Sequence, residues 1–240
     1  MVCKHYLRLN SSKRVIYSNS KLWRIQIFDH SMKSLPIIVA FLIITTSSYA
    51  HVPYFEYKDF SKQRPFMVLH TIEQSIAVYA WLENDSTDYS EDIDVYVFRI
   101  DEAARIYLEL LVPVCEGYEE FVPWFALVGP LLPEPQKSLP FDLALGYGAV
   151  VLQNVYPGQP RDTFYEPFGG KSYYEGPIFD EIIDLPVTYY VYFWDPYQTG
   201  GDYVAVMGWK EIWRPQDIIR GLIFTPLIRK DRELHIECFK

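Results

Sequence analysis

The amino-acid sequence predicts an all-β protein, an antiparallel β-sandwich of jelly-roll type with one short C-terminal helix. Short runs of β-branched and aromatic residues alternate between apolar and polar positions, as half-buried strands do. Turn residues punctuate these runs, with 17 prolines and 12 glycines in the chain. A 3.6-residue period appears once, near the C-terminus, which argues against repeated β-α-β units and a parallel sheet.

The strands follow one another at fairly even spacing. They are expected at residues 66–70, 74–82, 93–100, 106–112, 124–128, 148–154, 178–184, 188–194 and 202–208. In the third of these, Asp94, Tyr96 and Phe98 share one face. Residues 129–142 are proline-rich and predict a loop, whereas 156–176 predict a long ordered insertion.

Pro215 suits the first turn of a helix, and Asp217 suits its positive N-terminal end. The helix should run to about Phe224, because Gly221 and Pro226 keep it short. Residues 233–238 read as a last strand or an extended tail.

Residues 32–50 have the layout of a secretory signal peptide. Lys33 supplies a short basic region, 35–44 are apolar, and Ser48 and Ala50 form a small-x-small cleavage site. The apolar core is shorter than the roughly twenty residues that span a bilayer. We therefore expect cleavage after Ala50, a mature chain that starts at His51, and a secreted or cell-surface protein.

Residues 1–31 fit no part of a normal signal, since they carry six basic side chains and one acidic one. They are interpreted as a non-native upstream extension, with translation starting at Met32. The alternative is a long basic region on a membrane-retained protein. Residues 51–240 then form a single β-sandwich domain, which would touch a membrane only through an uncleaved leader.

The domain is strongly acidic. Residues 51–240 contain fifteen Lys and Arg and thirty Asp and Glu, a net charge near −15. Such a surface repels nucleic acid and anionic lipid headgroups, so nucleic acid is not expected as a partner. It suits cations, basic partners or simple solubility.

Cys115 and Cys238 are the two cysteines of the mature chain. In an exported domain the simplest interpretation is a disulfide, and the alternative is two buried thiols. A metal pair is disfavoured, because neither cysteine has a nearby Cys or His in ligand spacing on one strand face.

Several segments resemble the bacterial pre-peptidase C-terminal (PPC-like) type of β-sandwich module. These are DIDVYVFRI, IYLELLVP and FALVGP in residues 92–130, and TYYVYFWDPYQTGGDYVAVMG in 188–208. The similarity covers roughly residues 75–130 and 178–208, although Asp202 departs from the closing G-x-Y-x-V strand. The segment FYEPFGGKSYYEGP resembles uncharacterised secreted prokaryotic proteins with this sandwich. The resemblance implies the fold and export, and it carries no catalytic residue across.

A histidine at a mature N-terminus offers its α-amine and imidazole together, and such nitrogen donors suit copper. His51 is therefore a candidate copper ligand, with His70 or His235 as the second histidine. The alternative is that residues 51–57 simply pack their aromatic side chains on the sandwich edge.

An acidic run offers hard oxygen ligands for calcium. The candidate calcium ligands are Asp85, Asp88, Glu91, Asp92 and Asp94. Their spacing does not match an EF-hand loop. A solvated acidic loop is the alternative.

Aromatic and polar side chains alternate around Gly169 and Gly170. The candidate ligand-binding residues are Phe164, Tyr165, Glu166, Lys171, Tyr173 and Tyr174. Exposed aromatic faces with polar neighbours stack on sugars or peptides. The alternative is a loop that folds back and caps the core.

The sequence contains neither a G-x-S-x-G elbow nor an H-E-x-x-H motif. A carboxylate pair such as Glu166 and Glu175 could serve a hydrolase, but nothing in the sequence singles it out. The favoured expectation is an exported, non-enzymatic module without an obligatory cofactor that binds a surface glycan, a cation or a protein partner. The alternative is a copper protein built on His51.

Overall fold

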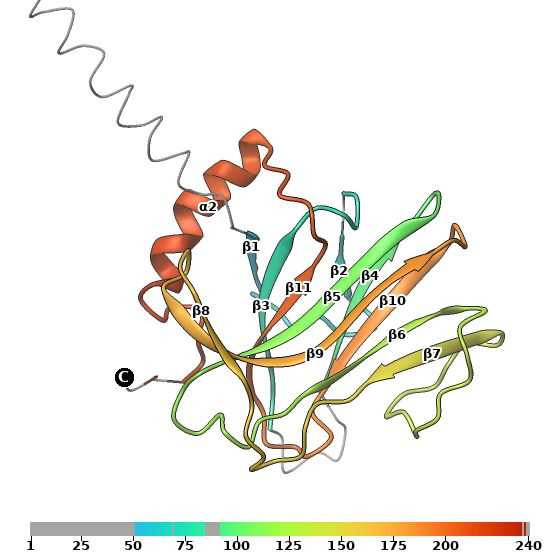
Figure 1. Ribbon diagram of the computed structural model, residues 1–240, viewed down its shortest axis with the longest axis horizontal. Helices are drawn as coiled ribbons and strands as arrows, with labels where there is room; N and C mark the ends of the chain where they lie inside the picture. The colour runs from blue at the N-terminus through green and yellow to red at the C-terminus, as the bar shows by residue number, and fades with distance from the viewer. Residues whose placement is uncertain (1–50, 69, 85–91, 237, 239–240) are drawn as a thin grey trace, which may run out of the picture. The chain divides into compact units, whose positions relative to one another are not determined.

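Two stacked β-sheets make up the described part of the chain (Figure 1). The computed structural model describes residues 51–68, 70–84, 92–236 and 238. The leader and the upstream extension that the sequence predicts in residues 1–50 lie outside these residues. The described residues belong to one compact unit of the chain.

The first sheet holds six strands. In spatial order they are β1 (Val52–Phe55), β3 (Ile76–Leu82), β11 (Gly201–Met207), β5 (Ala104–Pro113), β9 (Lys171–Ile183) and β8 (Thr163–Glu166). The second sheet holds β2 (Phe66–Met67), β4 (Ile93–Arg99), β10 (Thr188–Trp194), β6 (Trp124–Pro130) and β7 (Tyr147–Leu152). The predicted all-β sandwich is confirmed.

The pairings are antiparallel except at two edges, where β1 runs parallel to β3 and β2 runs parallel to β4. The chain passes from one sheet to the other between β1 and β2, and returns between β2 and β3. Each edge strand is therefore separated from its partner by two crossings between the sheets, and it runs in the same direction as that partner.

The core lies between the sheets and follows the predicted alternation. Ile76, Val78, Ala80 and Leu82 of β3 all face it, as do Ile106, Leu108, Leu110 and Val112 of β5. On the other sheet, Tyr96 and Phe98 of β4 point inward. The predicted shared face of Tyr96 and Phe98 is therefore confirmed, and it is the face that points inward.

Helix α2 (Pro215–Ile228) packs against β1 at the edge of the first sheet. It continues past Phe224 because Pro226 lies on an exposed side, where water can reach the carbonyl of Leu222 that the proline leaves without an N–H. No helix in the described residues is long and apolar enough to cross a membrane.

Candidate binding site

The segment predicted as an insertion contains a β-hairpin at the edge of the first sheet. Strand β8 pairs antiparallel with the first residues of β9, with Tyr165 opposite Ser172 and Glu166 opposite Lys171. The Glu166 carboxylate closes the turn, because it accepts hydrogen bonds from the backbone N–H groups of Phe168 (2.7 Å) and Gly169 (2.5 Å). Gly170 follows with a φ of +68°, a conformation that glycine adopts without strain.

Alternation along the hairpin separates its side chains onto two faces. Ser172 and Tyr174 share one face of β9, and Tyr165 faces the same way from β8 because it pairs with Ser172. Phe164 and Tyr173 share the opposite face, where they pack on a second apolar cluster with Val204 and Val206.

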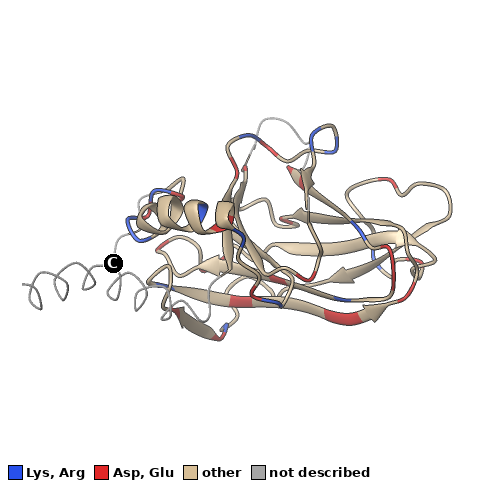
Figure 2. Cartoon of the chain, turned by 90° about the horizontal axis from the view of Figure 1, so that it is seen from above, with Lys and Arg blue, Asp and Glu red and all other residues tan. Residues whose placement is uncertain are grey.

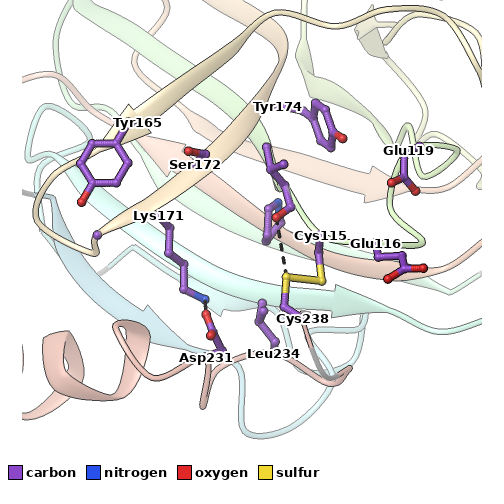
Figure 3. Close-up of a pocket in the computed structure, with 13 residues that line it drawn as sticks. Cys115, Glu116, Glu119, Tyr165, Lys171, Ser172, Tyr174, Asp231, Leu234 and Cys238 are labelled. Carbon is purple, nitrogen blue, oxygen red and sulfur yellow. Dashed lines mark hydrogen bonds and ion pairs between the residues drawn. A yellow bond between two sulfur atoms is a disulfide. The ribbon is translucent and has the colours of Figure 1, made fainter. Parts of the chain in front are cut away.

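A pocket of about 510 Å³ opens beside this hairpin. Its walls come from three segments: the hairpin, the residues that follow β5, and the chain after α2. The lining residues from these are Tyr165, Gly170–Ser172 and Tyr174; Pro113–Glu116 and Glu119; and Asp231, Leu234 and Cys238. Figure 3 shows Tyr165 and Tyr174 on two sides of the group, with the disulfide between the other two segments. We call this cavity the hairpin pocket.

Two links hold the C-terminal wall in place. Cys238 is disulfide-bonded to Cys115, with their Cα atoms 5.2 Å apart, so the expected pairing is present. The ammonium of Lys171 lies 2.6 Å from Asp231 Oδ1 and also contacts Glu233 Oε1. We call residues 229–236 and 238 the tail; its residues 233–236 and 238 lie in no strand and include a turn at Glu233 and bends at His235 and Ile236, so the described part of this segment is neither a strand nor evenly extended.

Carboxylates dominate the charge of the hairpin pocket. Glu116, Glu119 and Asp231 line it, and Lys171 is the single basic side chain among the lining residues. Because Lys171 is already paired with Asp231 and Glu233, it is not available to bind an anion. The pocket therefore disfavours acidic ligands and offers acceptors for hydroxyl and ammonium groups.

The two tyrosines of the pocket differ in how firmly they are held. The guanidinium of Arg161 lies 3.9 Å from the ring centroid of Tyr174, and Arg161 also donates to the carbonyls of Tyr118 and Phe121. Tyr174 is therefore fixed by its neighbours. Tyr165 is 63% exposed, so its ring is free to contact a ligand.

The structure gathers three of the six predicted ligand residues at the hairpin pocket, namely Tyr165, Lys171 and Tyr174. Phe164 and Tyr173 instead pack on the outer apolar cluster, and Glu166 holds the turn. The predicted disulfide joins the tail to the segment after β5, but sequence reasoning did not place Glu116, Glu119 or Asp231 at a site, since no local pattern brings them to the hairpin.

No protein-family model matches this chain, and a search of curated proteins found no match. The resemblance to PPC-like modules stays a prediction.

The pair Glu166 and Glu175 does not have the spacing of a glycosidase site. Glu166 pairs with Lys171, four positions from Glu175 along the same strand, which is about 13 Å of extended chain. Glycosidase carboxyl groups lie about 5–9.5 Å apart. Glu166 is also occupied by the turn that it closes.

The predicted calcium ligands are only partly described. Asp85, Asp88 and Glu91 lie outside the described residues. Asp92 accepts a hydrogen bond from the backbone N–H of Glu83 at 2.7 Å. Asp94 is buried, and calcium binding at this run stays a prediction.

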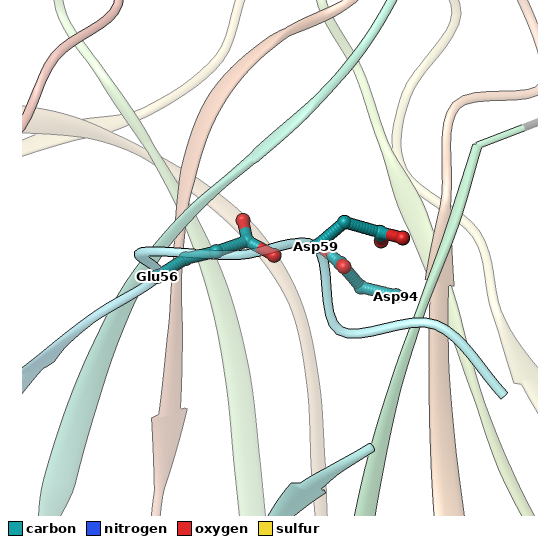
Figure 4. A group of neighbouring side chains, drawn as sticks. All are labelled: Glu56, Asp59 and Asp94. Atoms are coloured by element: carbon teal, nitrogen blue, oxygen red, sulfur yellow. The ribbon is translucent and has the colours of Figure 1, made fainter. Parts of the chain in front are cut away.

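Asp94 meets two carboxylates that sequence reasoning did not select. Oxygens of Glu56, Asp59 and Asp94 lie within 4.8 Å of one another (Figure 4). Asp94 accepts hydrogen bonds from Tyr203 Oη (2.6 Å) and from the Phe60 N–H, and Glu56 accepts from the Trp81 and Phe60 N–H groups. Burial raises the pKa of Glu56 to about 7, and burial together with the charge of Glu56 holds the pKa of Asp94 well above its ordinary value.

His51 lies at the start of β1 with its Nδ1 2.5 Å from Ser75 Oγ. Burial lowers the pKa of its imidazole to about 4, so the ring is neutral at neutral pH. The ring of His235 lies against that of Trp81, tilted by 52° with the centroids 3.5 Å apart. Trp81 is six positions beyond Ser75 in extended chain, which places His235 about 20 Å from His51. His70 contacts Gln216, and copper binding at His51 stays a prediction.

His235 belongs to a hydrogen-bonded network with Asp202 and Tyr118 that the sequence did not predict. Its Nδ1 lies 2.6 Å from Oδ1 of the buried Asp202, and Tyr118 donates to the other oxygen of Asp202 at 2.5 Å. The backbone N–H of His235 also donates to Asp202. These bonds fasten the tail to β11 just beyond the hairpin pocket.

Proposed function

We propose that this protein is an exported, non-enzymatic β-sandwich module that binds a short neutral or amino-bearing glycan in the hairpin pocket. The observation that carries the proposal is the pairing of an exposed tyrosine with a fixed one around a cavity rimmed by carboxylates. Aromatic faces stack on the apolar faces of sugars, while carboxylate and hydroxyl oxygens accept from sugar hydroxyls.

The size and charge of the pocket support a glycan of this class. Its volume of about 510 Å³ falls within the ~300–1,000 Å³ of ordinary small-molecule sites. Glu116 and Glu119 would repel uronic or sialic acids, because these sugars carry a carboxylate of their own. The lining residues include no free cation that could pair with that carboxylate.

The disulfide supports export. Disulfides persist in oxidising compartments outside the cytosol, and the Cys115–Cys238 bond agrees with the signal peptide expected at residues 32–50. The intact mass of the exported protein would report the cleavage point and the state of both cysteines in one measurement.

Glycan-array binding by a chain that starts at His51 tests the proposal. The Tyr165→Ala variant should lose binding to neutral or amino glycans, because the proposed ligand stacks on this ring. The variant should stay folded, because the exposed ring makes few contacts within the protein. Tyr156→Ala is the matched control, because Tyr156 is similarly exposed at 67% and lies outside the pocket. Binding that Tyr165→Ala leaves intact, or preference for acidic glycans, would contradict the proposal.

A further inference from the structure

Helix α2 turns an apolar stripe outward. Ile218, Ile219, Leu222 and Ile223 are all exposed, with Leu222 at 71% and Ile219 at 59%. At 100° per residue, these four side chains and Pro226 fall within one side of the helix. No charged residue of α2 lies in this stripe.

The inward side of α2 is fixed by polar and aromatic contacts, so the outward direction of the stripe is set by the packing of the helix. Asp217 is fully buried and accepts hydrogen bonds from the Gln74 side chain (2.9 Å) and the Arg214 N–H. The guanidinium of Arg220 lies 4.1 Å from the ring centroid of Tyr54. Phe224 stacks on Phe55 of β1 with ring centroids 4.5 Å apart.

The same part of the chain is basic, unlike the rest of the domain. Residues 209–232 carry six Lys and Arg and three Asp and Glu, a net charge of +3, whereas the other residues of 51–240 sum to −18. Of the three acids, Asp217 is buried beside Arg220, and Asp231 pairs with Lys171. Figure 2 shows several blue segments at α2 and the turn after it, with further blue segments in the loop at the top of the view and red segments on the strands.

The basic side chains lie next to the apolar stripe. Arg229, Lys230 and Arg232 are exposed and follow the last turn of α2. Arg229 and Lys230 continue the angular range of the stripe when the helical period is extended. An apolar face bordered by Lys and Arg is the pattern of helices that lie in a membrane interface.

We propose that α2 is a membrane-docking element, which lies flat on an anionic lipid surface with Leu222 and Ile223 between the lipid headgroups. The apolar stripe would contribute burial, and Lys230 and Arg232 would contact lipid phosphates, while Arg229 donates a hydrogen bond to the Phe168 carbonyl at 2.9 Å. The acidic remainder of the domain would be repelled, which leaves the α2 face as the favoured orientation. The sequence predicts membrane contact only through an uncleaved leader. Docking by α2 would be a second contact, made by the domain itself.

The charge also favours a lipid surface over a second copy of the chain. Two α2 faces packed together would bring two segments of +3 charge into contact, whereas anionic headgroups complement them. A self-associated form is therefore an outcome that the test must separate.

Vesicle co-sedimentation of the chain that starts at His51 tests the proposal. Both sheets, the described core and the disulfide lie within this chain, so it keeps the contacts described above. We expect binding to vesicles of phosphatidylcholine mixed with phosphatidylglycerol, weaker binding to phosphatidylcholine alone, and weaker binding as salt rises.

Two double variants separate the apolar and the charged contributions. Leu222→Ser with Ile223→Ser, and Lys230→Glu with Arg232→Glu, should each lower binding by about tenfold or more. The matched controls are Ile182→Ser with Leu145→Ser, which are exposed apolar residues elsewhere, and Lys58→Glu with Lys137→Glu. Thermal melting of each variant checks that it is folded, and both controls should bind as the parent does.

Failure to bind anionic vesicles would overturn the proposal, as would an equal loss of binding in the controls. A concentration-dependent dimer that Leu222→Ser with Ile223→Ser dissociates, without vesicle binding, would assign the face to a second copy instead. Tyr165→Ala should leave vesicle binding unchanged, so this result is independent of the glycan pocket.

Discussion

The ammonium of Lys171 lies 2.6 Å from Asp231 Oδ1 inside a largely buried site that also contains the Glu233 carboxylate. Burial raises the pKa of Glu233, which the neighbouring Lys171 opposes. One cation therefore interacts with two carboxylates, and it joins strand β9 to the tail.

Lys171→Met should destabilise the protein strongly. It would leave the buried Glu233 without its cation, and removal of one partner from a buried pair costs about 3–5 kcal/mol. Urea unfolding near neutral pH measures the free energy of unfolding. Adding Glu233→Gln to the variant should recover about half of the loss, and a single variant as stable as the parent would contradict this account.

Removal of the disulfide should lower both stability and glycan affinity. The bond closes a loop over a sequence separation of 123 residues, for which chain entropy predicts about 5 kcal/mol, or a melting temperature about 10–20 °C lower. Cys238 and Leu234 also line the hairpin pocket, so a released tail would open its wall. The double variant Cys115→Ser with Cys238→Ser should have the same melting temperature and the same glycan affinity as the parent protein whose disulfide has been reduced. A reduced parent that melts and binds as before would contradict the role of the bond.

Stability should fall as the pH rises through the titration of Glu56. Its folded pKa of about 7 exceeds the ordinary 4.5, so the folded state binds more protons than the unfolded state between these values. Glu56 therefore stabilises the fold fully below about pH 4.5 and loses this contribution by about pH 7. Each pKa unit between 4.5 and about 7 corresponds to about 1.36 kcal/mol. Because the side chain of Glu56 keeps some contact with water, we expect a smaller total loss, of about 2 kcal/mol.

Asp94→Asn isolates the part of this pH dependence that comes from the neighbouring charge. The asparagine removes the buried Asp94 carboxyl, whose pKa burial and the charge of Glu56 raise, while its amide oxygen can still accept a hydrogen bond from Tyr203. Urea unfolding at a series of pH values should show a smaller decline than in the parent. Asp142→Asn, at an exposed loop position, should keep the parent slope. Equal slopes in the parent and in Asp94→Asn would contradict the coupling.

Period-two alternation was enough to group Tyr96 and Phe98 on one face of β4, because burial between two sheets imposes alternation on a strand. Strand β10 was predicted at its observed bounds, Thr188–Trp194, since turn residues mark both ends. The hairpin of β8 and β9 was missed, because Pro167 and two glycines interrupt the pattern and the buried Lys171 reads as a surface residue.

The candidate site could be predicted only in part for a related reason. Tyr165 and Tyr174 stand out locally, whereas Glu116 and Asp231 reach the pocket through long-range pairing that no spacing reveals. The polar environment of Lys171 likewise comes from residues far along the chain.

Helix α2 should be the element most sensitive to loss of one buried carboxylate. Asp217→Ala would leave the Arg214 N–H and one hydrogen bond of Gln74 without their acceptor, and would leave Arg220 without its carboxylate partner. We expect a cost of about 3 kcal/mol, concentrated at α2 because this network joins the first turn of the helix to Gln74. Hydrogen exchange should rise in α2 while β10 stays protected. Asp217→Asn, which keeps an acceptor oxygen, should show a smaller rise. Unchanged exchange in Asp217→Ala would mean that Phe224 and Ile228 hold the helix by apolar packing. In that case apolar packing, and not the polar contacts of Asp217, would set the direction in which the apolar stripe of α2 faces.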